Sequence, residues 1–508
     1  MSVRNNIIAN YVGQGWSVAM NLVFVPVYVT ALGIESYALV GIFAALQAWL
    51  ALLDLGMTPT LQREMARFAG GLATPTWIRD LLRSVEIICA IIGGLAALIL
   101  LMAANYIATD WLRTSLPPAE VALAIQIMGV VVGLRFWEAI YRSALYGLEH
   151  QVWFNAFNVI ATTARFGGAA LVILLWQPSI VAFFGWHLLV SAVSVVLLRV
   201  KLGRAVPPGG RAARFSPSAL AEIKAFALGM IGINLTALIL TQADKVILTR
   251  LLPMAEFGFY TLAVTMCSVL VAMTGPIVQG AYPRLVRSIA AGDGRAFEET
   301  YHRGAQLVAV AAGSVAAVLC VFASLIARIW TDDPALAAKT GPLLAALAGG
   351  TFLNALMQIP YFGLLAVGET RFPLRANIVA AAILIVALLV LVPRYGALAA
   401  AATWLAINAG FVTIGLALLH RRHLSGLLRN WYVRDTVPAV AAAFTVCITL
   451  RIALSDIVLN RIGGFICLAL VGMLTLVAAI VATRDVFDAL RVFLARGRVR
   501  FSSVPGSE

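Results

Sequence analysis

The chain has 508 residues, of which 62% are hydrophobic and only 12% are charged. A soluble domain carries about a quarter charged residues, so this composition argues against a soluble fold. The formal net charge of +14 comes from Lys and Arg spread over short segments between apolar runs. The chain holds no long basic block of the kind that binds nucleic acid, and no nucleic-acid partner is expected.

Apolar runs of about 20 residues, long enough to cross the hydrocarbon core of a bilayer, recur along the whole chain. We therefore predict an all-α, polytopic membrane protein with about 14 transmembrane helices. The expected spans are 8–32, 37–57, 81–104, 120–143, 155–176, 180–199, 221–248, 257–280, 303–330, 340–366, 374–392, 397–419, 436–455 and 462–482.

Alternate connections between these spans carry most of the Lys and Arg that lie outside the spans. The basic segments are 58–80, 200–219, 281–302, 367–373, 420–435 and the residues after 483. The connections between them carry few basic side chains, such as Arg113 and Lys339. Because basic loops of membrane proteins stay in the cytoplasm, this bias predicts that both termini are cytoplasmic.

Polar side chains recur along three of the predicted spans: the first, the seventh and the tenth. A polar stripe on a membrane helix either hydrogen-bonds to neighbouring helices or lines a wet cavity. The first and seventh spans each begin one half of the chain, so two of the stripes lie at corresponding places. We therefore favour a cavity lined by hydrogen-bonding groups. The predicted lining residues are Asn10, Gln14, Asn21, Tyr28, Asn234, Thr241, Asn354 and Gln358.

The densest charged group inside a span is Arg135, Glu138 and Arg142, which share one helical face at spacings i, i+3 and i+7. Arg165 of the next span lies at a similar depth. One interpretation is an Arg–Glu pair that locks two helices together. The other is a cationic wall that binds an anionic ligand, which we favour, because the arginines outnumber the glutamate and guanidinium suits phosphate oxygens.

The segment 200–219, rich in Pro, Gly and Arg, is the longest polar connection and predicts a linker between two halves. The halves are weakly repeated, with Arg67 falling on Arg287. Each half holds six predicted helices, an even number, so we expect lobes related by an axis along the membrane normal, around a central cavity. The expected domains are an N-terminal lobe at 1–199, the linker at 200–219, a C-terminal lobe at 220–419, two further helices at 420–482 and a basic cytoplasmic tail at 483–508.

Asp244 and Lys245 are adjacent near the predicted outer end of the seventh span. Neighbouring residues on a helix point apart, so we do not expect them to be each other's partner. They either line an exit from the cavity or extend toward water.

The sequence offers no catalytic or metal-binding constellation. The five histidines are scattered, and the five cysteines lie singly in apolar stretches. We expect no enzyme activity, no metal and no cofactor, while coupling of transport to H⁺ or Na⁺ stays open.

Three motifs follow one another in the first part of the chain: LGIESY at 32–37, LDLG at 53–56 and REMAR at 63–67. In this order and spacing they resemble the start of the polysaccharide-biosynthesis, O-antigen-type flippases of the multidrug, oligosaccharidyl-lipid and polysaccharide exporter superfamily. The resemblance implies two six-helix lobes around a cavity and export of a lipid-linked oligosaccharide by alternating access. It also suggests a gate, in which Asp54 pairs with Arg63 or Arg67 and Asp244 and Lys245 act at the opposite end. The alternative for Asp54 is a helix-capping role beside arginines that set the topology.

We therefore predict a flippase for polyprenyl-diphosphate-linked oligosaccharides in the bacterial inner membrane, serving lipopolysaccharide O-antigen or exopolysaccharide synthesis. Its partners would be the lipid-linked substrate, membrane lipids, and a polymerase and chain-length regulator of the same pathway. A cation-coupled drug extruder is the main alternative, but the first span lacks the carboxylate that such proteins use. A membrane-embedded polymerase or glycosyltransferase is disfavoured, because no long outer loop or catalytic carboxylate pair is present.

Overall fold

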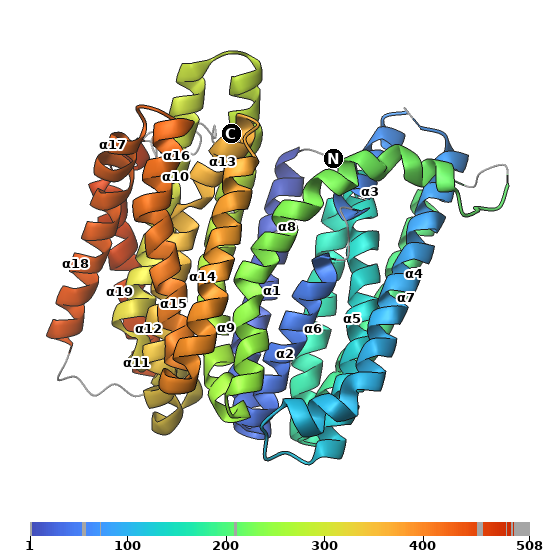
Figure 1. Ribbon diagram of the computed structural model, residues 1–508, viewed down its shortest axis with the longest axis horizontal. Coiled ribbons are helices and arrows are strands. Elements are labelled where there is room, and N and C mark those ends of the chain that lie inside the picture. Colours follow the sequence, from blue (N-terminus) through green and yellow to red (C-terminus); the bar gives the residue numbers. More distant parts are fainter. Residues whose placement is uncertain are drawn as a thin grey trace, which may run out of the picture. The chain divides into compact units, whose positions relative to one another are not determined.

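The computed structural model describes residues 3–52, 57–71, 73–207, 211–454, 461–483, 485–488 and 491. Within these ranges the chain is built of helices and has no β-strand (Figure 1). The helices are α1 (Val3–Leu32), α2 (Ile34–Leu52), α3 (Met57–Ala69), α4 (Pro75–Tyr106), η1 (Ile107–Trp111), α5 (Pro118–Gly147), α6 (Gln151–Leu175), α7 (Ile180–Ala205), α8 (Pro217–Leu251), α9 (Met254–Ala290), α10 (Gly294–Val321), α11 (Ala323–Thr331), α12 (Pro334–Leu356), α13 (Gln358–Ala366), α14 (Arg371–Tyr395), α15 (Ala397–Gly410), η2 (Phe411–Gly415), α16 (Leu416–Arg422), α17 (Leu428–Asn430), η3 (Trp431–Thr436), α18 (Val437–Ala453) and α19 (Arg461–Ala482).

The helices coincide with the predicted membrane spans. Twelve described segments are long and apolar enough to cross a membrane. The shorter apolar helix α2 and the 35-residue helix α8 lie at the two remaining predicted spans. The prediction of an all-α, polytopic membrane protein is therefore confirmed.

Two features differ from the sequence-based prediction. The predicted connection 58–80 begins with an amphipathic helix, α3, which buries Leu61 and Met65 and exposes Arg63 and Arg67. The tenth span breaks at Met357 into α12 and α13. Pro360 explains the break, because its ring nitrogen has no hydrogen to donate to the carbonyl of Leu356 and its ring crowds that carbonyl.

By backbone packing the chain forms two compact units. The first comprises Met1–Thr261 and Asn377–Ala397, and the second comprises Leu262–Ala376 and Leu398–Glu508. The lobe boundaries and the parallel repeat expected from the sequence stay predictions.

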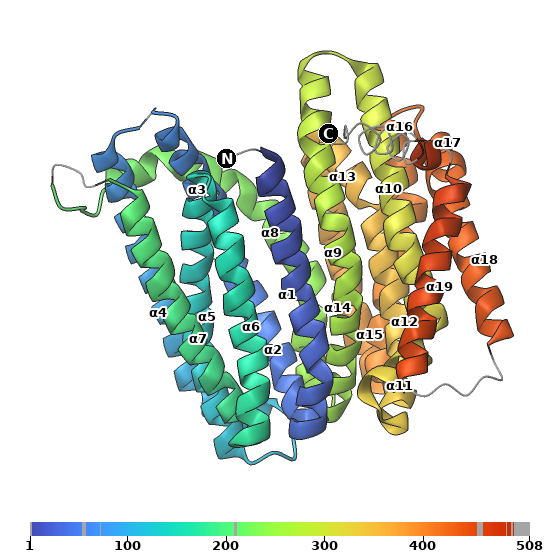
Figure 2. The same cartoon turned by 180° about the vertical axis from the view of Figure 1, so that it is seen from behind.

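Glycines set the helix spacing in the first unit. In both views α1 lies beside α6, while α5 packs with α4 and α7 (Figures 1 and 2). A Cβ atom added to Gly93 of α4 would lie 3.3 Å from the backbone of Gly133 of α5. One added to Gly13 of α1 would lie 2.3 Å from the side-chain oxygen of Asn155 of α6. Such small residues let membrane helices approach closely, and here they set the distance of α4 from α5 and of α1 from α6.

Candidate functional site

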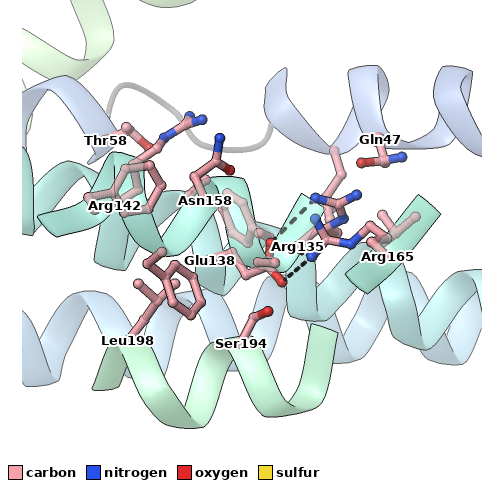
Figure 3. Close-up of a pocket in the computed structure, with 16 residues that line it drawn as sticks. Gln47, Thr58, Arg135, Glu138, Arg142, Asn158, Arg165, Ser194 and Leu198 are labelled. Atoms are coloured by element: carbon pink, nitrogen blue, oxygen red, sulfur yellow. Dashed lines mark hydrogen bonds and ion pairs between the residues drawn. The ribbon is translucent and has the colours of Figure 1, made fainter. Parts of the chain in front are cut away.

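The four charged residues singled out inside the spans line one cavity of the first unit. The cavity has a volume of about 510 Å³ and is lined from α2, α3, α5, α6 and α7. Arg135, Glu138 and Arg142 enter it from successive turns of α5, and Arg165 enters it from α6 (Figure 3). The structure thus brings these four side chains together, and their role in binding stays a prediction.

Glu138 is shared between two arginines. Its carboxylate accepts hydrogen bonds from Nη2 of Arg165 at 2.9 and 3.2 Å and from Nη1 of Arg135 at 3.4 Å, drawn as dashed lines in Figure 3. The Arg165 side chain is only 4% exposed, against 25% for Arg135. The arrangement therefore includes the interhelical ion pair that was one of the two interpretations.

The ion pairs leave hydrogen-bonding capacity and positive charge in the cavity. Within the described residues, Nε of Arg135 and Nε of Arg165 are buried without a hydrogen-bond partner. Arg142 is exposed, and within the same ranges it makes no hydrogen bond or ion pair. Three guanidiniums face one carboxylate, so an anion with several oxygens would find a net attraction and, at Arg142, exposed donors.

An aromatic and polar wall, which the sequence analysis missed, completes the cavity. Phe136, Phe154 and Phe157 line it together with Asn158. Phe157 is stacked on Trp153, with ring centroids 5.5 Å apart and an interplanar angle of 7°. The sequence feature that could have indicated this wall is the cluster of aromatic residues at 153–157, at the start of α6.

The predicted lining residues of α1 whose side chains are described do not line this cavity. Gln14 is exposed and Asn21 is half-buried, and the side chain of Asn10 falls outside the described part of the chain. Tyr28 is 1% exposed, and its hydroxyl donates a hydrogen bond of 2.6 Å to the carbonyl of Phe166. In this structure Tyr28 therefore ties α1 to α6.

The predicted lining residues of the second half form contacts within their own units. Thr241 is exposed and donates to the carbonyl of Ala237 in its own helix. Asn354 donates to Asn408 at 3.0 Å and accepts from Gln358 at 3.5 Å, forming a row of amides between α12, α13 and α15. The side chain of Asn234 in α8 lies outside the described residues.

The predicted inner gate is only partly described. Asp54 lies outside the described residues. Arg67 and Arg63 both pair with Glu64, at 2.9 and 3.3 Å, and the Glu64 side chain is buried. The structure therefore brings both arginines to a carboxylate of their own helix, and their action as a gate stays a prediction.

Asp244 and Lys245 contact each other, and each also binds a further group. Nζ of Lys245 lies 3.4 Å from Oδ1 of Asp244 and donates to the carbonyl of Thr241 at 2.9 Å. The long, flexible lysine stem lets the ammonium fold back over the preceding residue. Tyr260 donates a hydrogen bond to the other oxygen of Asp244.

Two acidic residues near the start of α4 were missed. Asp80 is buried, pairs with Arg211 and accepts a hydrogen bond from the backbone N–H of Arg214, which fixes part of the predicted linker. Glu86 accepts a hydrogen bond from the hydroxyl of Tyr141 at 2.8 Å. Carboxylates at the edge of a long apolar run were the available signal.

Comparison with known proteins agrees with this architecture. The family model "Polysaccharide biosynthesis protein" matches residues 3–289, and the model "MatE" matches residues 230–391. A curated Shigella flexneri protein named "Putative O-antigen transporter" is 19% identical over 404 residues, which cover 80% of this chain and 94% of that protein.

Two solved structures share the fold. The lipid II flippase MurJ in its inward closed conformation aligns with a TM-score of 0.67 at 12% identity, over 96% of this chain and 100% of that one. The MATE multidrug transporter DinF-BH aligns with a TM-score of 0.62 at 14% identity, over 82% of this chain and 95% of that one.

The match over residues 3–289 covers more than half of the 508 residues. It confirms the resemblance found in the opening motifs, and the shared fold agrees with it. The chain belongs to the polysaccharide biosynthesis protein family, within the multidrug, oligosaccharidyl-lipid and polysaccharide exporter superfamily, and is a multi-pass membrane transporter rather than an enzyme.

Proposed function

We propose that this transporter is a flippase that moves polyprenyl-diphosphate-linked oligosaccharides across the bacterial inner membrane for cell-surface polysaccharide synthesis. The observation that carries the proposal is the excess of guanidinium over carboxylate in one cavity of a chain of this family. The names of the relatives, an O-antigen transporter and a lipid II flippase, are consistent with such a substrate.

The chemistry of the cavity suits the head group of a lipid-linked sugar. The diphosphate would be held by the donors of Arg142 and by the positive charge of Arg135 and Arg165. Charges in a cavity of low dielectric constant interact more strongly than in bulk water. The first sugars would lie along Phe154, Phe157 and Asn158.

Several features belong to the proposal rather than to the cavity itself. Both termini would be cytoplasmic, and a polymerase and a chain-length regulator would take over the exported unit. The gate would involve Asp54 with Arg63 or Arg67 at the inner end, and Asp244 with Lys245 at the outer end. No cofactor is required, and H⁺ or Na⁺ would be the coupling ion.

Cation-coupled drug extrusion is the second candidate, favoured by the match of residues 230–391 to the MatE model. The cavity argues against it, because three arginines around one glutamate repel organic cations.

The test is to replace Arg142 and measure polymer export together with membrane abundance. Arg142 makes no ion pair within the described residues, so Arg142→Ala should leave abundance unchanged. Loss of a charge-assisted hydrogen bond costs about 1.5–3 kcal/mol, so export at limiting substrate should fall by roughly tenfold to a hundredfold. Arg142→Lys should be milder, because it keeps the charge but loses the two-pronged geometry.

The matched control is Arg204→Ala, which removes the same charge from an exposed position at the end of α7, outside the cavity. It should export normally. Equal export by Arg142→Ala and Arg204→Ala would contradict the proposal that the cavity binds the diphosphate.

A further inference from the structure

His187 is a buried titratable residue that the transport proposal does not use. It lies on α7, is 3% exposed, and is surrounded by aromatic rings. The ring centroids of Phe183, Phe166 and Phe43 lie 4.4, 6.0 and 6.2 Å from that of the imidazole. Three helices, α2, α6 and α7, therefore enclose it.

Both nitrogens of this imidazole lack a partner. Within the described residues, Nδ1 and Nε2 of His187 are buried without a hydrogen bond, and so is Oγ of Ser191 one turn further along α7. Buried polar atoms in proteins are nearly always paired with protein groups or water. A run of unpaired polar atoms on one helix face therefore indicates a place that exchanges protons or binds small polar species.

The same face of α7 continues into the anion cavity. His187, Ser191, Ser194 and Leu198 follow each other at spacings of four, three and four, so they share one side of the helix. Ser194 and Leu198 line the cavity. A hydrogen bond of 2.8 Å from Nε1 of Trp186 to the carbonyl of Ala164 holds this part of α7 at the level of Arg165.

The charged groups around His187 are mostly positive. From α5 and α6 the charges of Arg135 and Arg165 act on it, and Glu138 lies between those two arginines. From α1 the titratable neighbour of this cluster is Tyr28, whose ring lies 5.0 Å from Phe183 and whose hydroxyl is bound to the carbonyl of Phe166. From α2 the uncharged ring of Phe43 lies beside the imidazole.

We propose that His187 is a proton-binding site linked to the anion site, so that the cavity takes up a proton from water when it takes up an anion. The inference rests on the proposed anion site. With the cavity empty, burial among aromatic rings and the two guanidiniums both disfavour an imidazolium. A bound dianion offsets the positive charge of the arginines and so favours protonation of an imidazole nitrogen. By linkage, a group that gains a proton on anion binding makes anion affinity rise as the pH falls.

The test measures the dissociation constant for sulfate between pH 6 and 8 at constant ionic strength, with the purified full-length protein. Sulfate stays a dianion over this range, so every proton taken up belongs to the protein. Wild-type affinity should rise by up to about tenfold per pH unit as the pH falls, the slope expected for uptake of one proton. His187→Gln should bind sulfate with a slope near zero, and so should His187→Phe, which suits the aromatic surroundings if the glutamine variant fails to fold.

His423→Gln is the matched control, because it removes a histidine that does not line the cavity. It should keep the slope. A pH-independent wild type, an unchanged slope in both His187 variants, or a slope lost equally in His423→Gln would overturn the proposal. If the wild type does not bind sulfate saturably, or if Arg142→Ala does not remove that binding, the anion site itself is wrong.

Discussion

Glu138 holds two helices together and, at the same time, limits how much positive charge the cavity presents. It takes both hydrogen bonds of Arg165, which is nearly fully buried, and a longer one from Arg135. Removing one partner of a buried pair leaves a charge without compensation, whereas removing both is much less costly. The stability role and the binding role of these side chains can therefore be separated by mutation.

We expect Arg165→Ala to destabilise the protein by about 3–5 kcal/mol, because Glu138 keeps only the longer contact with Arg135. Membrane abundance and the melting temperature in detergent should both fall. The double variant Arg165→Ala/Glu138→Ala should regain abundance but not export. Restored export in the double variant would mean that the three charges serve only as an ion pair.

At the level of elements, α1 and α6 meet along a seam of polar and small residues. Asn158 donates to Oγ of Ser17 at 2.9 Å, and Trp16 donates to Oγ1 of Thr163 at 2.9 Å. Gly13 lies against Asn155 at the same seam. Part of the polarity on α1 is thus interhelical hydrogen bonding, which was the alternative to a wet cavity.

Gly13→Ala should open this seam, because the new methyl group would lie 2.3 Å from a side-chain oxygen of Asn155. The cost should be roughly 1–3 kcal/mol, typical of overpacking, seen as a lower melting temperature. Gly15→Ala is the control, since no atom lies within 4 Å of its added Cβ. Equal melting temperatures for the two variants would argue that α1 and α6 do not approach as described.

For the whole molecule, the expected orientation in the membrane follows from the basic connections. Arg204, at the end of α7, and Gln177, between α6 and α7, lie at opposite ends of one helix and are both exposed. With an impermeant maleimide in intact cells, Gln177→Cys should be labelled, whereas Arg204→Cys should react only after permeabilisation. The wild-type chain, with its five cysteines on apolar helices, gives the background. Labelling of Arg204→Cys from outside would reverse the topology and the proposed direction of transport.

The fold class followed from the sequence because membrane helices are specified locally. A helix of about 20 consecutive apolar residues makes its backbone hydrogen bonds within itself, and its side chains suit the hydrocarbon core of the bilayer. Both hold whichever helices surround it. Each span could therefore be predicted from its own residues. The grouping of Arg135, Glu138 and Arg142 likewise followed from the helical spacing on α5 alone.

Only the tertiary structure decided which of the polar side chains are hydrogen-bonded to other parts of the protein. Tyr28 is bound to α6 and Asn354 to Asn408, and neither choice is visible in the spacing along one helix. The division of Glu138 between Arg165 and Arg135, and the placing of His187 beside the ring of Phe166, depend on how α5, α6 and α7 pack. The physical reason is that an unpaired polar group in an apolar surrounding takes whichever partner packing brings within reach, and that partner comes from another helix.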